Sequence, residues 1–110
     1  MTTQGQHLTL DIWLKPIDLE FLVDNICEYI YANFTVVNQV ENKFYPCGRT
    51  LVLVLSESHF TVHTYPEHDY ISLDLYICNM ITDLEKVAND IVQMGSVSHA
   101  KYEIKKRGFR

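Results

Sequence analysis

The chain has 110 residues, 47% of them apolar, which is enough for one hydrophobic core but not for two. No run approaches the ~20 apolar residues of a membrane span, and the N-terminal residues lack the basic start and apolar centre of a signal peptide, so we expect a cytoplasmic protein with no membrane contact. The net charge of −5, with a basic cluster only at 101–110, argues against nucleic-acid binding.

The first part of the chain predicts a strand and then a helix. Residues 7–14 alternate apolar and polar side chains, as in a half-buried strand, and Pro16 ends this segment. Asp18 is a candidate helix N-cap. Apolar residues follow at helical spacing from Leu19 to Ile30, which indicates an amphipathic helix of about four turns.

The middle of the chain is typical of strands joined by turns. Residues 34–44 are rich in β-branched and aromatic side chains, and 45–48 carry a turn signal. The continuous apolar run within 49–55 predicts a strand buried on both faces. Residues 60–64 and 70–77 predict two further strands.

The last part of the chain predicts a second helix and a final strand. The segment from Thr82 to Glu85 has the form of a capping box. The helix behind it is expected to end at Gly95, and residues 97–105 read as a strand.

The predicted order is therefore β-α-β-β-β-β-α-β, typical of an α+β fold in a single domain, 1–110. We expect a two-layer sandwich in which both helices lie on one face of a mainly antiparallel sheet. The other face would have no cover within the chain, so a homodimer is expected to hide it.

The segment "LSESHFTVHTYPE", residues 55–67, places serines, a glutamate and two histidines between apolar strands. On a strand, His59 and His63 would lie about 13 Å apart, too far to share a zinc ion, so no metal site is expected. Ser58 and His63 would lie on opposite faces, and no nucleophile elbow surrounds the serine, which leaves a hydrolase unsupported. Ordinary strand and turn residues remain an equally good interpretation.

The three cysteines, Cys27, Cys47 and Cys78, have no CxxC spacing. This argues against a disulfide framework and against a zinc site. The simplest interpretation of any one of them is a small buried apolar residue.

A longer pattern adds what periodicity cannot. The segment "SESHFTVHTYPEHDYISLDLYIC", residues 56–78, strongly resembles the bacterial S-adenosylmethionine decarboxylase proenzymes. The family pattern S-E-S-H-x-T-x-H-[ST]-x-P-E is met at Ser56, Glu57, Ser58, His59, Thr61, His63, Thr64, Pro66 and Glu67. "GQHL" at 5–8 and "KFYPCG" at 43–48 resemble two further family segments.

The resemblance implies a pyruvoyl enzyme that makes its own cofactor. Ser58 Oγ would attack the Glu57 carbonyl, and elimination from the ester would leave chains 1–57 and 58–110, the second beginning with a pyruvoyl group. His63 and the hydroxyl of Thr50 would assist this processing. The pyruvoyl carbonyl would form a Schiff base with the substrate and accept electrons during decarboxylation.

The resemblance also implies roles in catalysis and binding. Cys78 would reprotonate the substrate carbon. Phe44 would stack on the adenine and Glu67 would bind the ribose hydroxyls. The active sites would lie at the interface of a homodimer, and the product would be the aminopropyl donor for spermidine synthesis.

The segment before the apolar strand departs from the usual family sequence G-V-S-G, because it reads Gly48-Arg49-Thr50-Leu51. These changes bear on the substrate, since related self-processing enzymes decarboxylate ornithine or arginine. Arg49 would disfavour a cationic substrate, while Phe44 and Glu67 favour S-adenosylmethionine. A non-catalytic partner subunit is a third hypothesis, which retention of Ser58, His63 and Cys78 disfavours.

Overall fold

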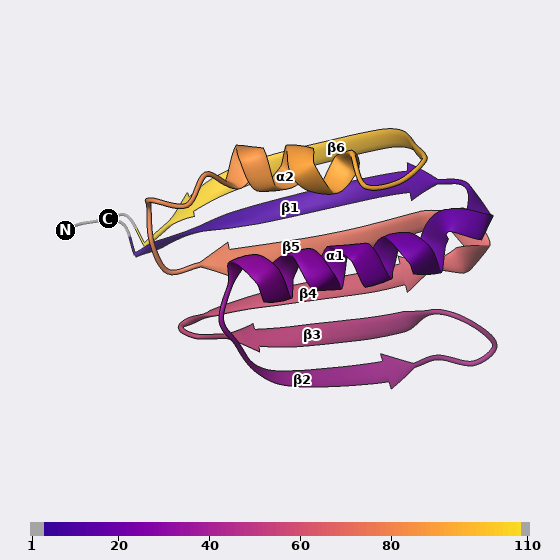
Figure 1. Cartoon of the computed structure of the whole chain (residues 1–110), viewed down its shortest axis with the longest axis horizontal. Coiled ribbons are helices and arrows are strands. Elements are labelled where there is room, and N and C mark those ends of the chain that lie inside the picture. The colour runs from indigo at the N-terminus through magenta and orange to yellow at the C-terminus, as the bar shows by residue number, and fades with distance from the viewer. Residues whose placement is uncertain (1–3, 109–110) are drawn as a thin grey trace.

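In the computed structural model, which describes residues 4–108, six strands form one sheet and two helices cover one of its faces (Figure 1). The elements are β1 (Gly5–Leu14), α1 (Leu19–Asn33), β2 (Val36–Lys43), β3 (Arg49–Leu55), β4 (Ser58–Tyr65), β5 (Tyr70–Ile77), α2 (Leu84–Val92) and β6 (Val97–Arg107), with 3-10 turns at Pro16–Asp18 and Pro66–His68. The predicted α+β sandwich and its element order are confirmed.

The strands lie in the order β2-β3-β4-β5-β1-β6, and every neighbouring pair is antiparallel. β1 is thus inserted between β5 and β6, far from β2 and β3 (Figure 1). Over residues 4–108 no helix combines the length and hydropathy that a membrane crossing requires.

The core lies between the sheet and the helices. Because side chains alternate along a strand, every second residue of β1, β3, β4 and β5 points toward the helices. The buried strand residues are Leu8, Leu10, Ile12, Leu14, Leu51, Leu53, Leu55, Phe60, Val62, Ile71, Leu73, Leu75 and Ile77. The buried helix residues that pack in this core include Leu22, Val23, Ile26 and Ile30 of α1 and Leu84, Val87, Ala88 and Ile91 of α2.

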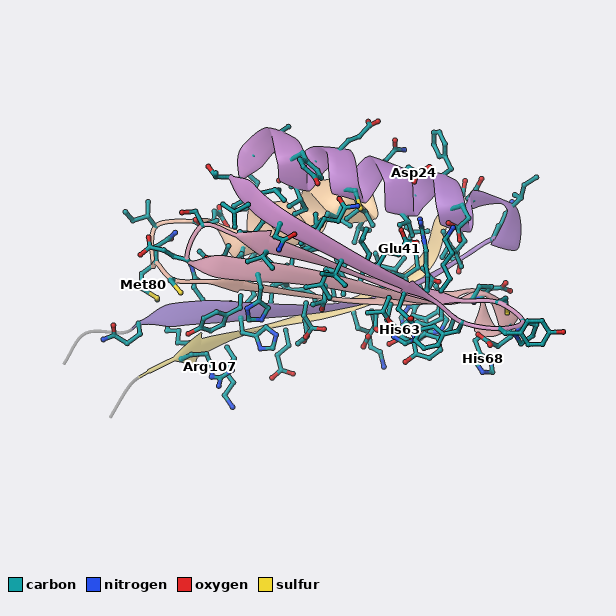
Figure 2. All side chains as sticks on the ribbon, turned by 90° about the horizontal axis from the view of Figure 1, so that it is seen from below. Asp24, Glu41, His63, His68, Met80 and Arg107 are labelled. Carbon is teal, nitrogen blue, oxygen red and sulfur yellow. The ribbon has the colours of Figure 1, made fainter. Side chains whose placement is uncertain are left out.

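The opposite side of the sheet, which we call the open face, is covered by neither helix of residues 4–108 (Figure 2). The prediction that β3 is buried on both faces is therefore wrong: Val52 is half-buried and Val54 is 37% exposed. A continuous apolar run indicates two covered faces only where elements pack on both, and the single chain supplies helices for one.

Two predicted helix starts differ in their capping. Asp18 occupies the N-cap of α1, but its side chain makes no capping hydrogen bond, because Asp18 has helical dihedrals as the last residue of a 3-10 turn. The capping box from Thr82 is wrong. Asp83 is the N-cap of α2 and accepts a 3.1 Å hydrogen bond from the Lys86 amide.

Several element ends also shift. α2 ends at Val92 with Gln93 as its C-cap, earlier than the predicted Gly95. Phe34 is not in a strand, since its amide donates to Ile30 O and closes α1. β4 begins at Ser58, because the turn before it contains only two residues.

Candidate active site

Ser58 is the first residue of β4 and is half-buried beside the turn that joins β3 to β4. Its Oγ accepts a 3.2 Å hydrogen bond from the backbone N–H of Cys78, just after β5. The register His59↔Tyr76 brings the start of β4 and the end of β5 together. Glu57, Ser58 and Cys78 therefore form one cluster, which we call the serine half-site.

A cavity of about 480 Å³ lies beside the serine half-site. It is lined by the end of α1 and the segment before α2, and its polar residues include Asn33, Thr35, Asn79 and Thr82 as well as Ser58. This volume is in the range of small-molecule sites.

His63 lies on the open face, as strand alternation requires, since its neighbours Val62 and Thr64 are buried against the helices. Its Nδ1 is 2.8 Å from Thr50 Oγ1, because the unshifted β3–β4 register places Thr50 directly opposite His63. Phe44 stacks on the same imidazole with ring centroids 5.4 Å apart.

Glu67 lies in the short turn between β4 and β5, at the same end of the sheet. The Cys47 thiol is 4.0 Å from its Oε2, so the turn after Phe44 contacts the turn that carries Glu67. We call Phe44, Thr50, His63 and Glu67 the histidine half-site. Sequence reasoning missed Cys47, although its place in the "KFYPCG" turn was a signal.

The structure separates the two half-sites. Five residues of extended strand place Ser58 and His63 about 16 Å apart, and no bulge in β4 shortens this path. In Figure 2, His63 lies at one end of the sheet and Met80, two residues after Cys78, at the other. The expected site residues of one chain thus lie at two opposite ends of the sheet, and they do not meet in a single site within the chain.

Arg49 does not face the histidine half-site, so its position does not support the expectation that it disfavours a cationic substrate there. Its guanidinium lies on the helix side, 2.9 Å from Glu20, 3.7 Å from Asp24 and 3.1 Å from Glu41. Burial acts to lower the Arg49 pKa, but the surrounding carboxylates outweigh it and hold the pKa above its ordinary value. Arg49 therefore ties β3 to α1 and β2, and its charge is neutralised there.

The three cysteines differ in their surroundings. Cys47 and Cys78 are exposed, whereas Cys27 is half-buried on α1. Burial, the largest effect, raises the pKa of the Cys27 thiol from 9.0 to about 11, against the lowering effect of Arg49. Its thiolate is consequently scarce at neutral pH.

We predict that Cys27 reacts with iodoacetamide at pH 8 about a hundredfold more slowly than a free thiol of ordinary pKa, because only the thiolate attacks. Peptide mass mapping over time measures this, and labelling in urea provides the control, where burial is removed. Equal Cys27 rates in the native and the urea-unfolded chain would contradict the prediction.

The chain is similar to known proteins over most of its length. The sequence model of the S-adenosylmethionine decarboxylase family matches residues 7–108. An S-adenosylmethionine decarboxylase proenzyme of Geobacillus sp. (strain WCH70) is 36% identical over 83 residues, which cover 71% of this chain and 67% of the relative. A second such proenzyme, from Bacillus cereus, is 32% identical over 100 residues, which cover 84% of this chain and 80% of the relative.

A solved structure shares the fold. The adenosylmethionine decarboxylase from Aquifex aeolicus VF5 aligns over 100% of this chain and 95% of its own, with a TM-score of 0.79 at 23% identity. The match of the family model over nearly the whole chain, together with the two relatives, identifies the protein family. The chain belongs to the S-adenosylmethionine decarboxylase family, whose members are pyruvoyl-dependent decarboxylases.

Proposed function

We propose that this protein decarboxylates S-adenosylmethionine with a pyruvoyl group that it makes from Ser58, after cleaving itself into chains 1–57 and 58–110. One observation carries the proposal. Ser58 begins β4 directly after a two-residue turn, and the Cys78 amide holds its Oγ at 3.2 Å. The relatives are named as proenzymes, which supports a processed chain.

The cleavage uses atoms of the chain and one water molecule. Ser58 Oγ bonds to the Glu57 carbonyl carbon, the C–N bond breaks, and the hydroxyl proton passes to the Ser58 nitrogen. Removal of the Ser58 Cα proton then expels the Glu57 carboxylate. The resulting enamine tautomerises to an imine, and water converts it to the ketone with loss of ammonia.

His63 is the base that we assign to this sequence, with Thr50 as its partner. The 2.8 Å contact between Thr50 Oγ1 and His63 Nδ1 fixes the orientation of the imidazole and leaves Nε2 available. Phe44 and Tyr65 both stack on this ring, with centroids 5.4 and 4.4 Å from that of His63, and so help to hold its orientation.

The residues present fit a pyruvoyl group at position 58. The Cys78 amide already donates to the oxygen at this position. The group supplies an electron sink for the carbanion that decarboxylation leaves. Cys78, exposed and adjacent, returns a proton to the substrate carbon.

A homodimer would complete the site. A two-fold axis that packs the open faces of two sheets together, with strand directions reversed, would bring one chain's serine half-site to its partner's histidine half-site. The open face carries a row of stacked rings suited to burial: Trp13, Tyr70, Tyr65, His63 and Phe44, with neighbouring centroids between 4.4 and 5.4 Å apart. The separation of the half-sites to opposite ends of the sheet is what such a dimer requires.

The histidine half-site also supports the nucleoside as part of the substrate. Phe44 is 43% exposed and offers a ring face for adenine, and Glu67 is exposed in the adjoining turn, where it can accept ribose hydroxyls. The product would serve as the aminopropyl donor for spermidine synthesis, in the cytoplasm.

Intact mass under denaturing conditions tests the cofactor. We expect two fragments, 1–57 and 58–110. The second should be lighter, by the mass of the ammonia that is lost, than the same fragment with an N-terminal serine. Decarboxylation is then measured as CO₂ release from S-adenosylmethionine, with ornithine and arginine as comparison substrates. A single chain that persists during incubation would contradict the proposal.

A further inference from the structure

Glu57 has an unusual backbone conformation, with φ at +67°. Among residues 4–108, only Glu57 and Asp69 combine a positive φ with a side chain other than glycine's hydrogen. L-residues with a Cβ disfavour this left-handed region, by a factor of about 5 to 30 in a conformational equilibrium. The residue that carries the scissile carbonyl is therefore strained.

The sequence of the turn does not relieve the strain. Ser56 and Glu57 alone join β3 to β4, with Leu55 paired to Ser58. Two-residue hairpin turns with positive φ favour glycine, asparagine or aspartate. A glutamate at such a position breaks the local preference, and breaks of this kind concentrate at functional sites.

The flanking residues prevent Glu57 from relaxing. Leu55 is buried, with 3% exposure, and the Ser56 amide donates a 2.9 Å hydrogen bond to Thr35 O. On the other side, Ser58 is held by its strand pairing and by the Cys78 amide. Since both neighbours are anchored, the left-handed conformation of Glu57 is held in place.

We propose that the left-handed conformation of Glu57 drives self-cleavage, because the first step releases it. This inference rests on the proposed function. When Ser58 Oγ bonds to the Glu57 carbonyl carbon and the C–N bond breaks, the proton passes to nitrogen and an ester links the residues through Cβ. This longer connection lets Glu57 leave the left-handed region. Release of the strain shifts the amide–ester equilibrium toward the ester by up to a factor of about 5 to 30. Because more ester is present, elimination from it is faster by the same factor.

The test compares three substitutions at one position. E57G removes the strain, and we expect its cleavage to be about 5 to 30 times slower than that of the wild type. E57A lacks the carboxylate but keeps Cβ, so it should cleave faster than E57G by the same factor. E57N should fall between them, because asparagine tolerates the left-handed region better than alanine. Rates are followed by intact mass on chain freshly made by cell-free synthesis.

D69G is the matched control. It removes the other positive-φ side chain of the described residues, at φ +53° in the turn before β5, and should leave the cleavage rate unchanged. A second readout uses the uncleavable S58A chain: adding E57G should raise its urea unfolding midpoint relative to adding E57A. This readout reports strain and not a lost side-chain function.

The outcomes separate the two proposals. If the wild-type chain does not cleave, the proposed function and this inference both fail. If the wild type cleaves and E57G cleaves as fast as E57A, only the inference fails. Equal unfolding midpoints of the two S58A double variants would likewise overturn it.

Discussion

Cells that express Ser58→Ala and His63→Ala chains together will contain cleaved protein and decarboxylase activity, whereas either variant alone will contain only the intact, inactive chain. In the proposed homodimer, each site combines one chain's serine half-site with its partner's histidine half-site. A mixed dimer would then carry one site with both lesions and one with neither. Random pairing makes about half of all dimers mixed, which restores about a quarter of the wild-type sites.

The cleaved fragments in this experiment must come from the His63→Ala chain, since it alone retains Ser58. Different tags on the two chains verify the mixed dimers, and intact mass identifies the cleaved one. Co-expression of Ser58→Ala with Cys78→Ala is the control: both lesions fall in the serine half-site, so activity should stay no higher than that of the Cys78→Ala chain alone. Verified mixed dimers without cleavage would mean that each chain processes itself.

Replacing Cys78 by alanine should lower decarboxylation about 100- to 10,000-fold, the usual contribution of a positioned general acid. Cleavage should be spared, within about threefold. The structural reason is that the group that holds Ser58 Oγ is the backbone N–H of residue 78, which alanine keeps. Intact mass measures cleavage, and CO₂ release measures turnover.

Cys78→Pro separates the backbone role from the thiol role. Proline removes the N–H as well as the thiol, so it should also slow cleavage, and comparison with Cys78→Ala isolates the hydrogen bond. Loss of cleavage in Cys78→Ala would instead assign the thiol to the processing chemistry.

Local patterns were sufficient for the fold because most strands alternate cleanly. β1 and β5 place every second residue in the core, and this alternation is visible in the sequence. Burial of β3 was predicted wrongly, because an apolar run does not reveal which face its neighbours cover. The start of α2 was predicted one residue early, since Thr82 and Asp83 are both capable N-caps and only the path of the chain selects Asp83.

The geometry around the expected site residues could be predicted only in part. Strand alternation already placed Ser58 and His63 on opposite faces, and the straight β4 agrees with this. The Thr50–His63 contact depends on the β3–β4 register, which a two-residue turn fixes but the sequence did not reveal. The pairing of Arg49 with Glu20 joins segments 29 positions apart, which short-range patterns cannot relate.

Because of the place of β1 in the sheet, folding after the proposed cleavage differs from folding before it. β1 belongs to 1–57, yet it lies between β5 and β6, which both belong to 58–110. The two fragments therefore share one sheet through the pairing of β1 with β5 and β6, and they stay interlocked after the bond breaks. If the cleaved protein unfolds, the two fragments must find each other again at a rate that depends on their concentration. The intact precursor is the only form that can fold as one chain, so its folding, unlike that of the cleaved protein, does not depend on protein concentration.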